Sequence, residues 1–215
     1  MSESEHPTKR RLLEVAVELF AGQGFAATSV RQVCTAADAN VASVNYYFGS
    51  KRALYDAAID FARAESNARN PWVALDERRD FWSDAEPEVR LRRFIAMMLD
   101  HGLDAEGNTS GLARMMFHEM LDPTPAWDRQ VEVSIARVFD ELREICRAVA
   151  GPGVDDATLT RMAVIINGQC MYPALASGCL TAMQPEVRLD QAGRERLAEL
   201  VGDGAVGLLR SLGGA

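Results

Sequence analysis

The residues from Val41 to Lys51 carry amide, phenol and ammonium groups at spacings that suit contact with a nucleic acid. Small side chains come first in this run, VASVNYYFGSK, and Asn45 and Tyr46 follow them. An amide can pair with a base edge in the major groove of DNA, and small residues permit a close approach. Gly49 is expected to end one helix, which places Lys51 in the first turn of the next, where its charge can face a phosphate. These residues predict a segment that binds duplex DNA and recognises its base sequence.

A short helix is expected just before this reading segment, from Ser29 to Ala37. Its apolar residues recur at i, i+3, i+4 and i+7, the spacing of one helix face: Val30, Val33, Cys34 and Ala37. Thr28 is the predicted N-cap, because its hydroxyl can accept a hydrogen bond from an unpaired amide at the helix start.

A tight turn separates this helix from a second one, predicted from Val41 to Tyr47. Asp38 tolerates the left-handed backbone conformation in such a turn, and Asn40 is suited to cap the second helix. Val44 and Phe48 lie four residues apart and form its buried side, so the other side chains face outward. The alternative is an ordinary helical hairpin with surface tyrosines, but exposing two adjacent tyrosines gains no stability. The pattern therefore favours a helix-turn-helix.

The segment from about Thr8 to Phe61 resembles the DNA-binding domain of the TetR family of bacterial transcription regulators. The resemblance lies in the following residues: Leu12, Leu13, Ala16, Leu19, Phe20, Gly22 to Phe25, Thr28, Val33, Ala36, Ala37, Tyr46, Tyr47, Phe48, Ser50, Lys51, Leu54 and Tyr55. Asp38 departs from the family, which usually has glycine in the turn. The residues expected to contact DNA are Thr28, Ser29, Arg31, Asn40, Val41, Ala42, Ser43, Asn45, Tyr46, Tyr47 and Lys51. Of these, Thr28, Ser29, Tyr47 and Lys51 are expected to hold phosphates.

Charge is distributed unevenly along the 215 residues, whose formal net charge is −8. Residues 1–65 hold seven Lys or Arg against eight Asp or Glu, so most of the acidity belongs to the remainder. The six basic residues that could form a local basic surface for DNA are Lys9, Arg10, Arg11, Arg31, Lys51 and Arg52. Modest non-specific affinity with a strong dependence on salt is expected.

The remainder of the chain shows helical periodicity throughout, which predicts an all-α protein. The expected domains are a helix-turn-helix domain at 6–66 and a larger helical domain at 67–215, for effector binding and dimerisation. Helices are expected at 50–68, 88–103, 109–121, 125–150, 157–177 and 189–212, with an irregular segment at 70–84 whose two tryptophans anchor it to the core.

The last two helices are expected to form a dimer interface. The helix from Ala157 is apolar on nearly every side and should be buried on more than one face. The last helix carries an apolar stripe with glycines between: Leu197, Leu200, Val201, Gly204, Leu208 and Leu209. Together they resemble the helix pair with which TetR-type regulators form a four-helix bundle. Packing within one chain is the alternative.

A small-molecule pocket is expected in the larger domain. Its candidate residues combine thioethers, aromatic rings and a few polar groups: Met98, His101, Met115, His118, Trp127, Phe139, Asn167, Gln169 and Tyr172. The segments HEMLDPTPAWD and INGQCMYP are similar to the ligand-domain signature of the CecR-like subgroup of TetR regulators. The resemblance implies a homodimeric repressor that binds a palindromic operator and is released by an effector.

The sequence is less compatible with an enzyme or a metal site. His118 and Glu119 begin like the zinc motif HExxH, but position 122 is Asp122, so the spacing fails and no metal or cofactor is expected. No nucleophile, base and orienting group occur at a recognisable spacing, which argues against an enzyme. A transcriptional activator, an effector-independent regulator and a protein-binding scaffold stay open as alternatives.

Location and redox state can also be predicted from the sequence. No run of about 18 uninterrupted apolar residues and no secretory signal is evident, so a cytoplasmic protein is expected. The four cysteines are expected to be reduced core thiols: Cys34, Cys146, Cys170 and Cys179. A redox-sensing role for Cys170 and Cys179 is the alternative.

Overall fold

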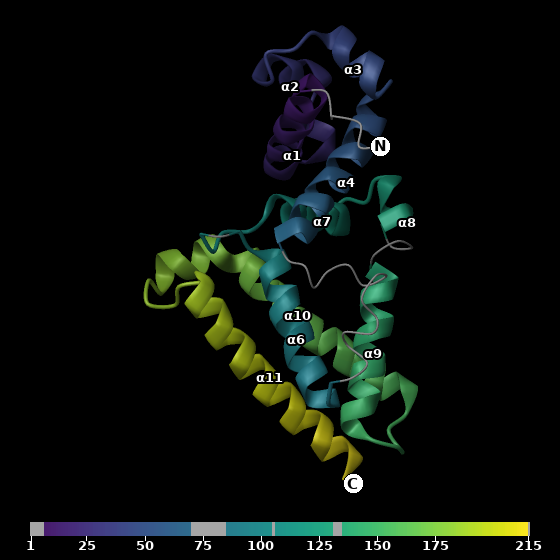
Figure 1. The fold of residues 1–215 in the computed structure, drawn as a ribbon, viewed down its shortest axis with the longest axis vertical. Helices are drawn as coiled ribbons and strands as arrows, with labels where there is room; N and C mark the ends of the chain where they lie inside the picture. Colours follow the sequence, from purple (N-terminus) through teal and green to yellow (C-terminus); the bar gives the residue numbers. More distant parts are fainter. Residues whose placement is uncertain (1–6, 70–84, 105, 131–134, 215) are drawn as a thin grey trace. The chain divides into compact units, whose positions relative to one another are not determined.

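The computed structural model describes residues 7–69, 85–104, 106–130 and 135–214. Within these ranges every named element is a helix, and the β pairing consists of an isolated bridge between Leu103 and Thr109 (Figure 1). The all-α prediction is therefore confirmed. The chain divides into two compact units, one made of the described residues up to 69 with 111–127, and the other of those in 85–110 and 128–214.

The first unit contains the helix-turn-helix. Its helices are α1 (Pro7–Ala27), α2 (Val30–Ala36), α3 (Val41–Tyr47), α4 (Lys51–Arg69) and α7 (Gly111–Leu121). The backbone of α1 leaves helical geometry at Gly24, with φ 77° and ψ 172°. A residue with a Cβ is strained at such a positive φ, which explains glycine at the turn expected between Gly22 and Phe25.

Aromatic and aliphatic side chains from α1, α4 and α7 share the core of this unit. Phe20 and Tyr55 meet edge to face with ring centroids 4.8 Å apart, and Leu112 and Met115 of α7 join the same buried cluster. A Cβ at Gly111 would lie 2.9 Å from Cγ1 of Val17, so α7 starts in close approach to α1. The structure thus groups α7 with the N-terminal helices, whereas the predicted boundary after residue 66 separates them.

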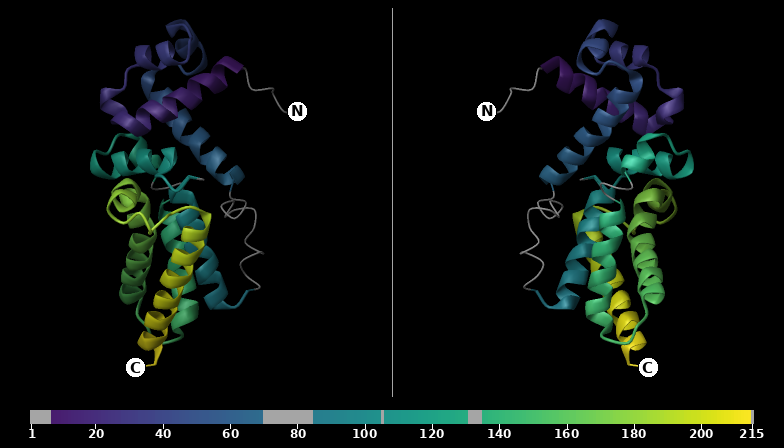
Figure 2. Two further views of the ribbon diagram at one scale, coloured as in Figure 1. Left: turned by 90° about the vertical axis from the view of Figure 1, so that its left-hand side faces the viewer. Right: turned by 90° about the vertical axis from the view of Figure 1, so that its right-hand side faces the viewer.

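The second unit is a bundle of α6 (Pro87–Gly102), α9 (Ala136–Ala150), α10 (Asp156–Met183) and α11 (Gln191–Gly213). All four pack against one another, and the turned views show them side by side (Figure 2). Pro87 occupies the first turn of α6, where its missing amide costs no hydrogen bond. The core side chains include Leu91, Phe94, Ile95, Leu142, Ile145, Leu159, Ile166 and Leu209.

Helix α10 differs from its prediction in length and burial. It extends six residues beyond Ser177, and Asp155 caps its start by accepting a hydrogen bond from the Thr158 amide at 3.0 Å. In the single chain only one face is buried, because Val164 and Tyr172 are 54% and 62% exposed. The expectation of burial on more than one face is therefore wrong for the isolated chain.

By length and composition alone, α10 could also cross a membrane, since an 18-residue window reaches a mean hydropathy of 1.2. A helix with one face in a protein core meets the same criterion. Its buried face, with Leu159 and Ile166 in the bundle core, accounts for part of this apolar character.

Two further predictions lie partly outside the described residues. The helix expected at 125–150 corresponds to α8 (Ala126–Gln130) and α9, and residues 131–134 between them are outside the description. The segment 70–84, with its two tryptophans, lies outside it as well.

Candidate nucleic-acid interface

The turn before α3 has the backbone that its residues favour. Asp38 adopts the left-handed conformation with φ 50°, and the Ala39 amide donates to the Cys34 carbonyl oxygen at 2.9 Å. Asn40 caps α3, because its Oδ1 accepts a hydrogen bond from the Ala42 amide at 2.9 Å. The two helices of the motif are therefore joined by a turn whose polar groups are paired.

Helix α3 buries one side and presents the other to solvent. Val44 is fully buried, while Tyr46 is 83% exposed and Val41 is 43% exposed. Ala42 and Asn45 are exposed beside them, and Ser43 is half-buried. Most of the residues expected to read base edges thus lie on one accessible helix face.

Two of the expected phosphate contacts are engaged within the protein. The Tyr47 ring is half-buried and packs edge to face against Tyr46, with centroids 5.0 Å apart. The Lys51 ammonium lies 4.4 Å from the centroid of the Phe25 ring and donates to the Ala26 carbonyl oxygen at 3.3 Å. An ammonium has three hydrogens, so this bond leaves Lys51 able to meet a phosphate as well.

The structure corrects the role of Thr28. Its side chain is 1% exposed, and its hydroxyl donates to the Gly24 carbonyl oxygen at 2.9 Å. The N-cap of α2 is Ser29, which accepts from the Gln32 amide while the Gln32 side chain accepts from the Ser29 amide. The turn at Gly24 exposes a carbonyl that needs a donor, and Thr28 supplies it. The hydroxyl of Thr28 is therefore not placed to hold a phosphate.

The expected basic surface is reduced by ion pairs inside the first unit. Arg10 pairs with Glu14 at 3.1 Å and with Glu65 at 3.3 Å, and Arg52 pairs with Asp56 at 3.3 Å. Arg31 is exposed on α2. Arg11 also lies 3.6 Å from a Glu14 oxygen. Carboxylates beside three of the six basic residues lower the positive potential available to DNA.

Family models match both parts of the chain. Residues 12–58 match the model described as bacterial regulatory proteins of the tetR family. Residues 87–212, more than half of the chain, match the C-terminal domain of the HTH-type transcriptional dual regulator CecR. The chain belongs to the TetR family. It is accordingly a DNA-binding transcriptional regulator and not an enzyme.

Individual TetR-family relatives match along most of their length. The HTH-type transcriptional repressor NicS of Pseudomonas putida is 26% identical over 167 residues, which is 77% of this chain and 74% of that protein. The dual regulator CecR of Shigella flexneri is 26% identical over 156 residues, 72% of this chain and 68% of that protein.

Solved structures share the TetR-family fold. AibR in complex with isovaleryl coenzyme A and operator DNA has a TM-score of 0.61 at 19% identity, covering 94% of this chain and 97% of that chain. A TetR-like regulator from Rhodococcus sp. RHA1 has a TM-score of 0.58 at 18% identity, covering 96% and 93%.

The residues expected to bind an effector are divided between the two units. Met115, His118 and Trp127 belong to the first unit, and the other six belong to the second. In the second unit Met98, His101, Phe139 and Asn167 are half-buried, whereas Gln169 and Tyr172 are exposed. The exposure of the last two does not support an interior pocket that they would line.

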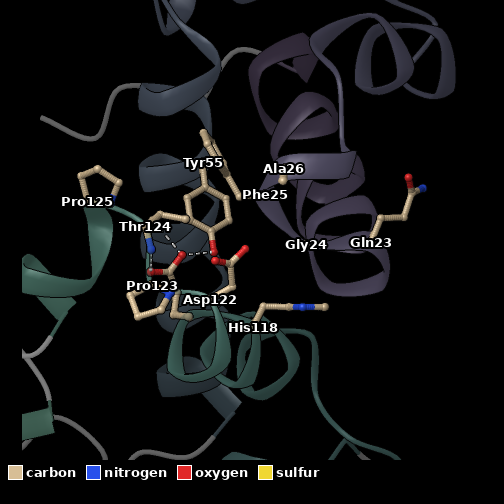
Figure 3. A pocket seen from close by; sticks show the side chains of 11 residues that line it. Gln23, Gly24, Phe25, Ala26, Tyr55, His118, Asp122, Pro123, Thr124 and Pro125 are labelled. Atoms are coloured by element: carbon tan, nitrogen blue, oxygen red, sulfur yellow. Dashed lines mark hydrogen bonds between the residues drawn. The ribbon is translucent and has the colours of Figure 1, made fainter.

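A cavity of about 280 Å³ lies within the first unit (Figure 3). It is bounded by the turn of α1 (residues 23–26), by Tyr55 of α4 and by the end of α7 with the loop after it (residues 118, 119 and 122–125). Of the expected effector residues, His118 lines this cavity.

A buried carboxylate beside the cavity was not predicted as a functional residue. Glu119 is 1% exposed and accepts hydrogen bonds from the Tyr55 hydroxyl at 2.7 Å and from the Thr124 hydroxyl at 2.8 Å. The Thr124 amide donates to its second oxygen at 3.1 Å. Burial, and then the hydrogen bond to Glu119, raise the pKa of Tyr55 above its usual range. A carboxylate in an otherwise apolar helix face is the sequence signal that could have drawn attention to Glu119.

The cysteines do not support a redox pair. Cys34, Cys146 and Cys170 are buried free thiols, as predicted, but Cys179 is exposed, so that prediction is wrong for one of the four. Burial raises the pKa of Cys146 and of Cys170 to about 12, which disfavours the reactive thiolate. Among the described residues no cluster of three or more potential metal ligands occurs.

Proposed function

We propose that this TetR-family regulator is a homodimeric repressor that binds a palindromic operator and is released by a small-molecule effector. The observation that carries the proposal is the exposed face of α3, where Asn45 and Tyr46 lie beside small residues on a capped, solvent-facing helix. One such helix reads only a few base pairs, so specificity requires two copies about one helical turn of DNA apart, roughly 34 Å.

The dimer is supported by an exposed apolar face on α10 and α11. Its large side chains are between 45% and 62% exposed in the single chain: Val164, Ile165, Tyr172, Leu175, Leu200 and Leu208. Gly168, Gly204 and Gly207 would each carry a Cβ into open space, so a partner helix can approach closely there. Large apolar side chains exposed on neighbouring helices in this number favour an interface between copies of a chain.

Effector release is the second part of the proposal. A ligand shifts the DNA-binding equilibrium only by its preference for the non-binding geometry, and roughly 3 kcal/mol of preference weakens binding about a hundredfold. The structure of AibR contains both isovaleryl coenzyme A and operator DNA, which makes acyl-coenzyme A thioesters a sensible first class to screen. We expect such a regulator to act in the cytoplasm.

To test the proposed function, the full chain is used to select the duplexes that it binds from a random pool. The site that the protein protects on the selected duplex is then mapped by footprinting. A two-fold symmetric protected site is expected. The double variant Asn45→Ala and Tyr46→Ala should lose at least about 30-fold of its preference for that site, since each of the two base contacts is worth roughly 1–3 kcal/mol. Both side chains are exposed, so fold and dimer should be retained. Undiminished selectivity would show that α3 is not the reading helix, meaning the helix that recognises the base sequence.

Repression and activation are separated by a different measurement. The named relatives include one repressor and one dual regulator. Placing the selected site over a promoter, and then upstream of it, in a reporter strain should lower expression in the first position. A rise in expression at both positions would favour the activator.

A further inference from the structure

Two neighbouring residues of α7 contact two different helices of the first unit. His118 lies against the end of α1, where its Nε2 is 3.3 Å from the Ala21 carbonyl oxygen. A Cβ at Gly24 would lie 3.3 Å from its Nδ1. Glu119 instead accepts a hydrogen bond from Tyr55 of α4. The pair therefore links α7 to both of the helices that flank the helix-turn-helix in sequence.

The link to α4 is geometrically demanding. Glu119 is 1% exposed, and its two oxygens accept three hydrogen bonds, two of them from Thr124 just beyond α7. A buried carboxylate is costly unless its donors are in place. Tyr55 is 1% exposed and has Phe20 and Phe25 around its ring, so its hydroxyl has little freedom to follow a displaced carboxylate. The positions of α4 and of the end of α7 are thereby tied together.

A cavity lies beside Glu119 and its donors, so the position of α4 relative to α7 depends on the hydrogen bonds of Glu119. Tyr55, Glu119 and Thr124 all line the 280 Å³ space, together with His118 (Figure 3). Where side chains are close-packed, many contacts oppose a small shift, but a void removes those contacts on one side. At this edge of the first unit, the hydrogen bonds of Glu119, and not close packing, keep α4 and the end of α7 in position.

We propose that His118 and Glu119, through Ala21 and Tyr55, are positioning residues for operator recognition: they hold α1 and α4 at the spacing that presents α3 to the major groove. Helices α2 and α3 are joined to α1 through residues 28 and 29 and to α4 through residues 48–50. A change in the angle between α1 and α4 therefore reorients α3. The proposal rests on α3 being the reading helix, as proposed above.

The test compares specific and non-specific DNA binding in Tyr55→Phe, which removes the hydroxyl and keeps the ring. The probes are the duplex selected by the unaltered protein and a scrambled duplex of equal length, at a temperature well below unfolding. Affinity for the selected duplex should fall by about 10-fold, and affinity for the scrambled duplex by less than about 2-fold, because phosphate contacts do not require an aligned α3. Thr109→Val is the matched control: its hydroxyl donates to the Ala174 carbonyl oxygen in the other unit, so it loses a hydrogen bond without affecting selectivity.

The outcomes distinguish this proposal from the proposed function. If the unaltered protein selects no duplex, the assignment of α3 as reading helix fails first. If it selects one and Tyr55→Phe binds that duplex as tightly, the positioning role is overturned. The Glu119→Leu variant, which removes both acceptor oxygens, should show the same loss of selectivity, and combining it with Tyr55→Phe should add little. Should either variant fail to fold, His118→Ala, at a half-buried site, provides the same comparison, and unchanged selectivity there also overturns the proposal.

Discussion

Thr28 and Ser29 are adjacent hydroxyl residues that serve different partners. Thr28 is buried and donates to a carbonyl oxygen at the end of α1, whereas Ser29 is exposed and accepts from an amide at the start of α2. Both are among the good N-cap residues, so residue type does not separate them. Burial decides which of the two can meet a phosphate.

Lys51→Ala should weaken binding to every duplex and lower the slope of log affinity against log salt by about 0.9 for each protomer bound, the effect of one lost phosphate contact per chain. It also removes the contact with Phe25, worth about 0.5–1 kcal/mol of stability at an exposed site. Titration at several salt concentrations measures the slope. Thr28→Val is the control: the loss of its buried hydroxyl should cost about 1–3 kcal/mol of stability and leave the slope unchanged. An unaltered slope in Lys51→Ala would assign Lys51 to packing against Phe25 alone.

At the scale of the elements, the ends of the short helices are defined by side-chain caps. Helix α3 spans only Val41–Tyr47, too short to be stable without its cap and its neighbours. Asn40 supplies that cap, and Ser50 does the same for α4 by accepting from the Ala53 amide at 3.0 Å. Because of these caps, α3 is already helical in the DNA-free protein.

Asn40→Ala should destabilise the first unit by about 0.5–2 kcal/mol, because the Ala42 amide loses its acceptor. Asn40→Asp retains an acceptor oxygen and should keep the stability, but its negative charge opposes DNA phosphates and should lower affinity. Thermal unfolding and duplex titration of both variants separate the two effects. Equal loss of stability in Asn40→Asp and Asn40→Ala would contradict the capping role.

At the scale of the molecule, an apolar face on α10 and α11 is left uncovered in the single chain. Six large side chains on it are 45–62% exposed, which is costly in water and is relieved if a second copy covers them. The arrangement of two reading helices, and with it the reading of a palindrome, depends on that contact.

Ile165→Glu should convert the expected dimer into a monomer of 23.6 kDa, because association would bury an unpaired carboxylate. Ile165 is 47% exposed in the single chain, so the substitution should change the stability of the fold by less than about 0.5 kcal/mol. Sedimentation at micromolar concentration measures the mass. Val187→Glu is the matched control, since Val187 is 45% exposed but lies outside both helices. A dimer that survived Ile165→Glu would place the interface elsewhere.

The sequence alone determined the helix-turn-helix and most helix limits, because these depend on local periodicity, caps and turns. Val44 at the buried side of α3, Asp38 in the left-handed turn and Asn40 at the cap all follow from neighbours within a few residues. Only the tertiary structure showed that Thr28 is buried, that α7 packs with α1 and α4, and that Glu119 meets Tyr55. Those facts join residues as many as 97 positions apart, such as Ala21 and His118, and helical periodicity does not specify which helices become neighbours.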